Sequence, residues 1–248
     1  MIEKEKNGVL WLEFELFQQF QNLSHGVFLK KGGVSTGQFS SLNLGFSTQD
    51  NQENILENLS RALFCLNLNQ WERGRFSHEE RVIALEDHSD LEFSFDGMAT
   101  QKKDVGLVIT HADCQAIILY DPVSEVVANI HSGWKGSILN ILGKAVELMQ
   151  ERFFSKTKNI FAGISPSLGP DDAEFVHYKK EIPEDLWRYR SGKNFFNFWD
   201  ISRMQLLKAG LRPEHIEIAG ISTRRHPDFF SYRRDRFCGR NATIAAIR

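Results

Sequence analysis

Three short segments near the middle of the chain, all apolar and rich in β-branched residues, constrain the fold most. They are residues 105–110, 115–120 and 126–130, and their composition is typical of strands. The run Asp121-Pro122-Val123-Ser124 separates the last two and has the residues of a tight turn. We therefore expect a β-sheet at the centre of the protein.

Strands and helices also alternate, irregularly, through the rest of the sequence. Apolar residues at helical spacing predict helices at 55–66, from just after residue 136 to about residue 153, and at 202–209. Further strands are expected at 9–14 (an edge strand), 25–29, 81–85, 159–164, 216–221 and 242–247. Because no strict βαβ alternation, linker or repeat is present, we predict one layered domain over residues 1–248, of the α+β or the α/β class.

Composition excludes several classes of protein. The 248 residues carry 30 Lys and Arg against 32 Asp and Glu, and this near-neutral balance argues against a dedicated nucleic-acid binder. An odd set of three cysteines, Cys65, Cys114 and Cys238, does not form a disulfide framework and indicates a reducing, cytoplasmic setting. No long apolar run is present, so neither a membrane span nor a signal peptide is expected.

Three residues at predicted strand ends could hold a metal ion. They are His88, Cys114 and His131, and two imidazoles with one thiolate suit Zn²⁺ while leaving a fourth position open. Two other interpretations remain. The cysteine could be a small buried hydrophobe beside hydrogen-bonded histidines, or Cys114 could be a nucleophile with His131 or His88 as its base, as in thiol hydrolases. Sequence spacing does not separate these alternatives.

Two further segments could bind anions. Residues 131–137 combine two glycines and Lys135 just before a predicted helix, which suits phosphate. Residues 222–240 hold six arginines interleaved with aromatic residues; a solvated arginine face is the favoured interpretation, and a non-catalytic nucleic-acid-binding module the alternative. His78-Glu79-Glu80 matches half of a zinc deaminase signature, but the Pro-Cys-x-x-Cys half is absent from the sequence.

Several motifs together resemble those of the YfiH-type, or laccase-domain, family. They are Ala112-Asp113-Cys114, His131-Ser132-Gly133-Trp134-Lys135-Gly136, Lys31-Gly32-Gly33-Val34-Ser35 with Ser41-Leu42-Asn43-Leu44-Gly45, Gly163-Ile164-Ser165-Pro166-Ser167-Leu168-Gly169, and Phe230-Ser231-Tyr232-Arg233-Arg234-Asp235 with Gly239-Arg240. The resemblance covers nearly the whole chain. It implies a single domain of mixed sheets covered by helices, an αββα sandwich.

The resemblance also implies an activity. Family members are described as purine nucleoside enzymes that carry out phosphorolysis and adenosine deamination at a mononuclear zinc site, here His88, Cys114 and His131. Purine nucleoside and phosphate would be the substrates, with Asp113 moving a proton or orienting a ligand, Lys135 holding phosphate, and Asn43 and Arg234 contacting substrate. We expect a monomer or weak homo-oligomer.

An older family name, copper polyphenol oxidase, implies a different chemistry. Multicopper oxidation needs many imidazoles, whereas this sequence has 8 His and no His-x-His pair, so copper is the less favoured metal. The chain also departs from the family pattern. Glu86-Asp87-His88-Ser89 stands where Gln-Val-His-Gly is usual, and Leu59 stands where an arginine often follows Asn58.

Overall fold

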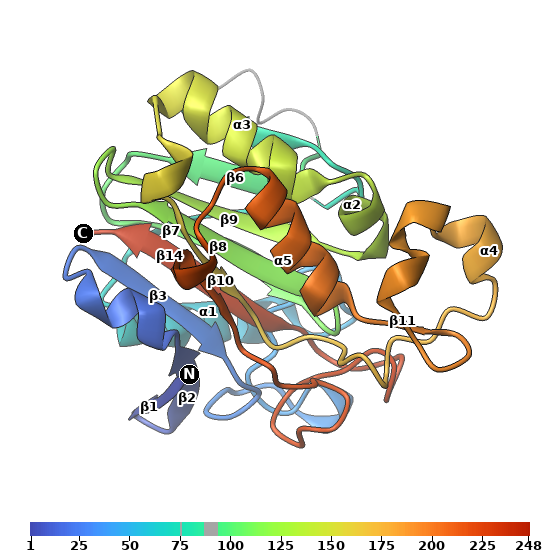
Figure 1. The fold of residues 1–248 in the computed structure, drawn as a ribbon. Helices are drawn as coiled ribbons and strands as arrows, with labels where there is room; N and C mark the ends of the chain where they lie inside the picture. The colour runs from blue at the N-terminus through green and yellow to red at the C-terminus, as the bar shows by residue number, and fades with distance from the viewer. Residues whose placement is uncertain (75, 87–93) are drawn as a thin grey trace.

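The computed structural model describes residues 1–74, 76–86 and 94–248, and its core is a pair of six-stranded sheets (Figure 1). The first sheet has the order β1-β2-β3-β14-β7-β4, and only its β4–β7 pair is parallel. Its strands are β1 (Ile2–Lys6), β2 (Val9–Glu13), β3 (Leu23–Phe28), β4 (Gln70–Arg73), β7 (Val105–His111) and β14 (Asn241–Ile247).

The second sheet has the order β13-β10-β8-β9-β6-β5, with parallel pairs at both edges. Its strands are β5 (Val82–Ala84), β6 (Gly97–Thr100), β8 (Gln115–Asp121), β9 (Val126–Ser132), β10 (Phe161–Ile164) and β13 (Ile216–Ile218). The chain passes from the first sheet to the second at the turn between β7 and β8, which contains Cys114.

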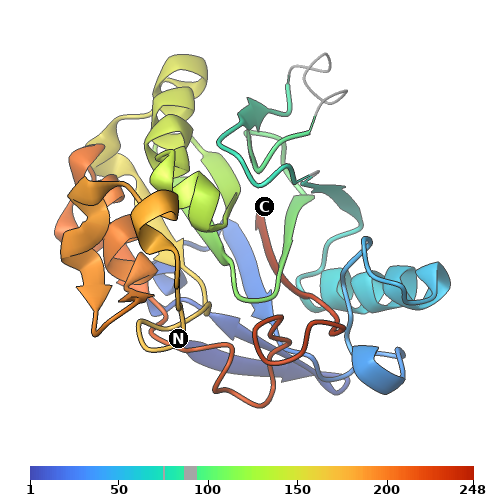
Figure 2. The same cartoon turned by 90° about the vertical axis from the view of Figure 1, so that its right-hand side faces the viewer.

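Helices cover the outer face of each sheet. The helix α1 (Gln52–Cys65) packs on the first sheet, and α3 (Ile141–Phe153) and α5 (Phe198–Lys208) pack on the second; Figure 2 shows them on opposite sides of the molecule. Shorter elements, α2 (Trp134–Ile138), α4 (Tyr178–Glu181), β11 (Arg190–Ser191) and β12 (Phe195–Phe196), lie between or beside the larger helices. The layers are helix, sheet, sheet, helix, which confirms the predicted α+β sandwich.

Alternation along the strands builds the three apolar layers of this sandwich. In β8, Ala116, Ile118 and Tyr120 join the core between the sheets, whereas Ile117 and Leu119 face the helices. Residues of β2, β3, β7 and β14 complete the inner core from the other side. This pleat decides which side chains near the β8–β9 hairpin face between the sheets and which face the helices.

The sequence located most central elements but misjudged others. Strand 9–14 is β2 and lies inside the sheet between β1 and β3, so its prediction as an edge strand was wrong. The true edge, β1, was missed because every residue in it after Ile2 is charged, and β4 and β6 were missed as well. The helix predicted to reach residue 153 is two helices, separated where Asn140 adopts a left-handed φ of 60°.

None of the described helices is long and apolar enough to cross a membrane.

The imidazole of His25 in β3 is buried and neutral. Its Nε2 accepts a hydrogen bond of 2.9 Å from the Phe14 backbone N–H, and the ring packs against Phe14 and Phe17. Burial lowers the pKa of His25 from 6.5 to about 4, and the carboxylate of Glu13 opposes that effect only in part. The folded protein therefore resists protonation at a site that the unfolded chain protonates readily.

We expect this histidine to reduce stability in acid. Below pH 6.5 the unfolded chain protonates His25, but the folded protein does so only near pH 4, so stability falls as the pH drops through that interval. The loss is about 1.4 kcal/mol per pH unit. His25→Gln offers the Phe14 N–H a non-titrating acceptor, so urea unfolding from about pH 7 to about pH 4.5 should show about 2–3 kcal/mol less loss than in the parent. His177→Gln, at an exposed histidine, is the control, and parallel pH curves for His25→Gln and the parent would refute the assignment.

Candidate metal centre

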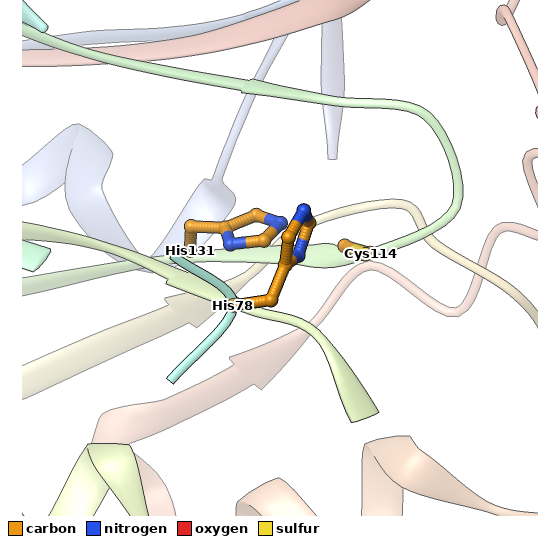
Figure 3. A group of neighbouring side chains, drawn as sticks. All are labelled: His78, Cys114 and His131. Carbon is orange, nitrogen blue, oxygen red and sulfur yellow. The ribbon is translucent and has the colours of Figure 1, made fainter. Parts of the chain in front are cut away.

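Three metal-ligating side chains from separate segments converge at one end of the sandwich. His78 lies in the loop between β4 and β5, Cys114 in the turn between β7 and β8, and His131 in β9. One donor atom from each lies within 4.8 Å of the donors of the other two. Figure 3 shows the two imidazole rings next to each other, with Cys114 on the neighbouring segment.

The hairpin of β8 and β9 places two of these residues. Ala116 pairs with His131 across the hairpin, so Cys114, just before β8, is brought to the same end of the sheet as His131. His131 follows Ile130, which faces the helices, and its own ring therefore turns to the face between the sheets. The strand register alone thus brings the thiol near one imidazole.

A third residue, His78, completes the cluster among the described residues. His88 lies outside the described residues, and the described part of the chain instead brings His78 to Cys114 and His131. The family motif did not distinguish His78 from His88. Gln-Val-His-Gly shares only its histidine with the segment around each of them. The one signal for His78 was its place shortly before a strand, in a segment that also matched half of a deaminase signature.

Asp96 holds two of the three residues in place. Its carboxylate is completely buried and accepts a 2.9 Å hydrogen bond from Nδ1 of His131. It also accepts hydrogen bonds from the backbone N–H groups of Ser77, His78 and Glu79 and from the Ser77 hydroxyl, at 2.9–3.1 Å. Because Nδ1 of His131 donates to Asp96, Nε2 is the nitrogen that can lose its proton to a metal ion, which is the usual arrangement of a metal-binding histidine. Sequence reasoning missed Asp96 because it belongs to no motif.

The electrostatics of the cluster follow from this arrangement. Burial lowers the pKa of His131, but the Cys114 thiolate and the Asp96 carboxylate outweigh it and raise the pKa to about 9. Burial raises the pKa of Asp96, and the hydrogen bonds from His131, Glu79 and Ser77 more than reverse that, leaving it below its usual value. The pKa of His78 is lowered by burial and by the neighbouring His131. The negative charge of Cys114 and Asp96 is thus concentrated around one imidazole.

Gly133 leaves a space beside all three donor residues. A Cβ added to it would lie 3.4 Å from the Cys114 Sγ, 3.5 Å from the His78 Nδ1 and 3.6 Å from the His131 Cε1. The missing side chain is therefore directed at the middle of the cluster. Together with a donor set of two imidazoles and one thiolate, this space fits a tetrahedral ion with three protein ligands and one open position.

We expect Gly133→Ala to narrow that open position without unfolding the protein. The new methyl group makes ordinary contacts with the three side chains, but it projects toward the position that a fourth ligand would take. In the Co²⁺-loaded protein, visible absorption should show azide binding about 5- to 150-fold more weakly, since overpacking costs about 1–3 kcal/mol. Gly169→Ala, whose Cβ would have Ser222, Trp199 and Asp172 as its nearest neighbours, is the control. Equal azide affinity in Gly133→Ala and the parent would contradict this placement.

An apolar pocket of about 340 Å³ adjoins the cluster at Cys114. Four aromatic side chains, Trp134, Phe175, Phe198 and Tyr232, contribute to its lining, and Cys114 and Asp113 lie at its edge. Trp134 and Phe175 meet edge to face at 5.9 Å, and Phe175 and Phe198 lie 5.3 Å apart. The pocket has the size and the rings to hold a flat heterocycle.

Asp113 is engaged within the protein. Its φ is 92°, one carboxylate oxygen accepts from the Thr223 hydroxyl at 2.7 Å, and the other accepts from the Arg233 backbone N–H at 2.6 Å. Its own carbonyl accepts from the Leu168 N–H. Asp113 therefore ties two distant loops to the β7–β8 turn beside Cys114.

The two residues expected from motifs to contact substrate are also bonded internally. Asn43 is completely buried; its Nδ2 donates to Thr48 and Asp50, and its Oδ1 accepts from the N–H groups of Gly45 and Arg240. The Arg234 guanidinium donates to the carbonyls of Thr223, Arg224, His226 and Phe229. Neither residue lines the aromatic pocket. In this structure both organise loops around the site.

Lys135 is exposed on α2, with its ammonium 5.7 Å from the Trp134 ring centroid. The helix α2 that begins at Trp134 ends at Ile138, and the longer α3 begins only at Ile141, so Lys135 does not lie at the start of a long helix as expected. Among the residues where the chain departs from the family pattern, Glu86 accepts hydrogen bonds from Thr100 and Gln101, and Leu59 lies on the buried face of α1. Thr100 pairs with Val127, at the opposite end of β9 from His131.

The arginine-rich segment is held largely by the protein's own acceptors. Arg224 and Arg225 both pair with Asp172, at 3.3 and 2.9 Å, and Arg233 donates to the Glu174 carbonyl. These contacts agree with a solvated arginine face that is anchored to neighbouring loops.

Comparison with known proteins assigns the class and then the family. The two-sheet sandwich matches solved structures over almost its whole length. YfiH of Bacillus licheniformis, described as a hypothetical protein, has a TM-score of 0.87 and 25% sequence identity over 99% of both chains. YlmD of Geobacillus stearothermophilus has a TM-score of 0.86 and 26% sequence identity, over 99% of this chain and 98% of that one. The family model described as "Multi-copper polyphenol oxidoreductase laccase" matches residues 24–248. The chain belongs to this family.

Curated relatives in the family carry an activity in their names. "Purine nucleoside phosphorylase YlmD" of Bacillus subtilis is 30% identical over 231 residues, which cover 85% of this chain and 83% of the relative. A protein of Bacteroides thetaiotaomicron named "Purine nucleoside phosphorylase" is 26% identical over 90% of each chain. The resemblance drawn from the sequence motifs is thus confirmed at the level of the family.

Proposed function

We propose that this protein is a zinc-dependent purine nucleoside phosphorylase. The observation that carries the proposal is the position of Cys114, which belongs to the metal-ligating cluster and also lines the aromatic pocket. The names of the relatives supply the substrate class, purine nucleoside and phosphate. All three cysteines are free thiols, which suits a reducing, cytoplasmic setting.

His78, Cys114 and His131 would hold the ion. Nitrogen and thiolate donors favour Zn²⁺ over the hard cations, and among the described residues this is the one cluster found with such ligands, which suits a mononuclear site better than a multicopper one. When bound, Zn²⁺ supplies a Lewis acid at the edge of the pocket. The protein's own contribution is to fix the donors, through Asp96, and to keep an approach open at Gly133.

The pocket would bind the nucleoside through its rings and its charged rim. The purine stacks on the aromatic side chains, and the exposed carboxylate of Glu174 accepts hydrogen bonds from ribose hydroxyls. Lys135 and Arg233 supply positive charge for phosphate, whose oxygen attacks the sugar carbon as the bond to the purine nitrogen breaks. Asp113, with both oxygens already accepting, acts by positioning the Arg233 loop.

Chromatography of nucleoside incubations tests this function. Protein with its metal content measured by elemental analysis is incubated with inosine or adenosine, with and without phosphate. Free base and ribose 1-phosphate that form only with phosphate are the expected products. Inosine formed from adenosine without phosphate would assign deamination instead, and no turnover by zinc-loaded protein would refute the proposal.

A second candidate, a thiol hydrolase, is favoured by one observation. His131 lies between the Cys114 thiol and the Asp96 carboxylate and interacts with both, which is the order of groups in a Cys–His–Asp triad. A triad has no use for His78, whereas a metal site needs it. Hydrolysis that survives chelation and His78→Ala but is lost on alkylation of Cys114 would support the hydrolase over the phosphorylase.

A further inference from the structure

Arg240 carries a positive charge to the rim of the aromatic pocket. Its guanidinium carbon lies 5.8 Å from the ring centroid of Tyr232, an exposed residue that lines the pocket. Two residues earlier, Cys238 belongs to the same small apolar cluster as Ala112, which lies in the pocket wall. No carboxylate among the described residues pairs with Arg240. A guanidinium stays charged at any ordinary pH, so this half-buried group can receive an anion beside the pocket.

Two sets of contacts fix this side chain and leave one edge of it free. The stem of Arg240 lies over Gly45, where an added Cβ would come within 2.5 Å of the Arg240 Cγ. Nη1 donates to the carbonyls of Cys238 and Gly239, at 2.8 and 3.0 Å. Nε and Nη2 have no partner among the described residues. These two nitrogens form one edge of the planar group, and such an edge pairs with two oxygens of an oxyanion.

Neighbouring arginines of the same loop use their guanidinium groups differently. Arg233 lines the pocket, but both of its terminal nitrogens donate to the Glu174 carbonyl, at 3.2 and 3.3 Å. Arg234 donates to four backbone carbonyls. Arg240 therefore differs from both in keeping an unpaired edge next to a residue of the pocket.

The charge of Arg240 also acts on the metal cluster. Burial and the neighbouring His131 lower the pKa of His78, and the charges of Lys135 and Arg240 lower it further. Both cations thus lie close enough to the cluster to attract an anion that is bound beside it.

We propose that the free edge of the Arg240 guanidinium binds the inorganic phosphate that attacks the nucleoside. This inference rests on the proposed function. Nε and Nη2 hold two phosphate oxygens, while Lys135 and Arg233 add positive charge at the rim. A third oxygen is then free to form the bond to the sugar carbon. The electron pair of the broken carbon–nitrogen bond and the proton lost by phosphate leave with the purine.

Steady-state kinetics with phosphate and inosine varied separately test this role. Arg240→Met removes both donors, so the KM for phosphate should rise at least about tenfold while the KM for inosine stays within about twofold. Arg240→Lys keeps the charge but not the planar pair of donors, so it should show most of the same rise. Arg236→Met is the matched control, because Arg236 is exposed on the same loop and does not line the pocket. It should keep both parental constants.

Phosphate binding gives a second readout that does not depend on turnover. The phosphorus NMR signal of inorganic phosphate should broaden in the presence of the parent protein and of Arg236→Met, and much less with either Arg240 variant. A lower melting temperature with parental broadening and a parental KM for phosphate would make Arg240 a structural residue only and overturn the proposal.

The outcomes separate this inference from the function beneath it. If zinc-loaded parent protein releases no base from inosine in phosphate, the proposed function is refuted, and the NMR comparison still decides whether Arg240 binds an anion. If both Arg240 variants keep the parental KM for phosphate and the parental broadening, the role of Arg240 is refuted while the phosphorylase function stands. If the parent cleaves inosine monophosphate faster than inosine and Arg240→Met loses that preference, the bound phosphate belongs to a nucleotide, which also overturns the proposal.

Discussion

Cys114→Ala is expected to yield a folded protein that has lost its metal ion and its nucleoside turnover. Cys114 supplies the one sulfur donor of the cluster, and two imidazoles alone do not complete a stable zinc site. Removing a group that only orients a metal ligand lowers metal affinity or activity about 10–100-fold. Removing the ligand itself should therefore lower turnover by more than about 100-fold. Elemental analysis gives the metal content, and the nucleoside assay gives the activity.

Cys65→Ala is the matched control for this substitution. Cys65 is buried at the end of α1, on the far side of the first sheet from α3 and α5, and its loss should cost stability while metal content and turnover persist. Stoichiometric metal and full activity in Cys114→Ala would exclude the metal mechanism. Full metal content with no activity would instead favour Cys114 as a nucleophile.

Asp96→Asn is expected to weaken both the metal site and the fold. The carboxylate is completely buried and accepts from His131 and from three backbone N–H groups of the loop that carries His78. An amide has one acceptor atom and can present its NH₂ group to His131, which would favour the wrong tautomer of that ring. We expect metal affinity to fall about 10–100-fold and stability to fall by about 3–5 kcal/mol, the cost of breaking a buried ion pair.

The same change at Asp121 separates the two effects. Asp121 is also completely buried, but it accepts from the N–H groups of Val123 and Ser124 in the turn after β8, away from the cluster. Asp121→Asn should lower the urea midpoint and leave zinc affinity, measured by competition with a chromophoric chelator, unchanged. If Asp96→Asn retained parental zinc affinity, Asp96 would not position the ligands.

Much of the fold was predictable because its central strands are local and apolar. The segments that became β7, β8 and β9 carry their own β-branched pattern, and the helix-forming stripe around Leu59 is equally local. Strands without such a pattern were missed. β1 is charged at every position after Ile2, and β4 is mostly polar, so both depend on pairing with another strand for their conformation.

Only the site residues that strand pairing brings together could be predicted from the sequence. Cys114 and His131 flank one hairpin, whereas His78 reaches them through a loop that Asp96 holds from another strand end. No local pattern encodes that contact. Asn43 and Arg234 belong to recognisable motifs, yet a motif does not reveal whether a polar side chain faces a ligand or the protein itself. Here Arg234 bonds to backbone carbonyls, and Asn43 bonds to backbone N–H groups and to the side chains of Thr48 and Asp50.

The turn at Cys114 gives a bound ion a mechanical role as well as a chemical one. The chain leaves the first sheet at His111 and enters the second at Gln115, while His131 belongs to the second sheet and His78 to a loop between the two. An ion held by all three would act as a cross-link across the junction of the sheets, and binding to the native state alone adds stability in proportion to the logarithm of its concentration. A core substitution that shifts one sheet relative to the other should therefore change zinc affinity before it causes any loss of secondary structure.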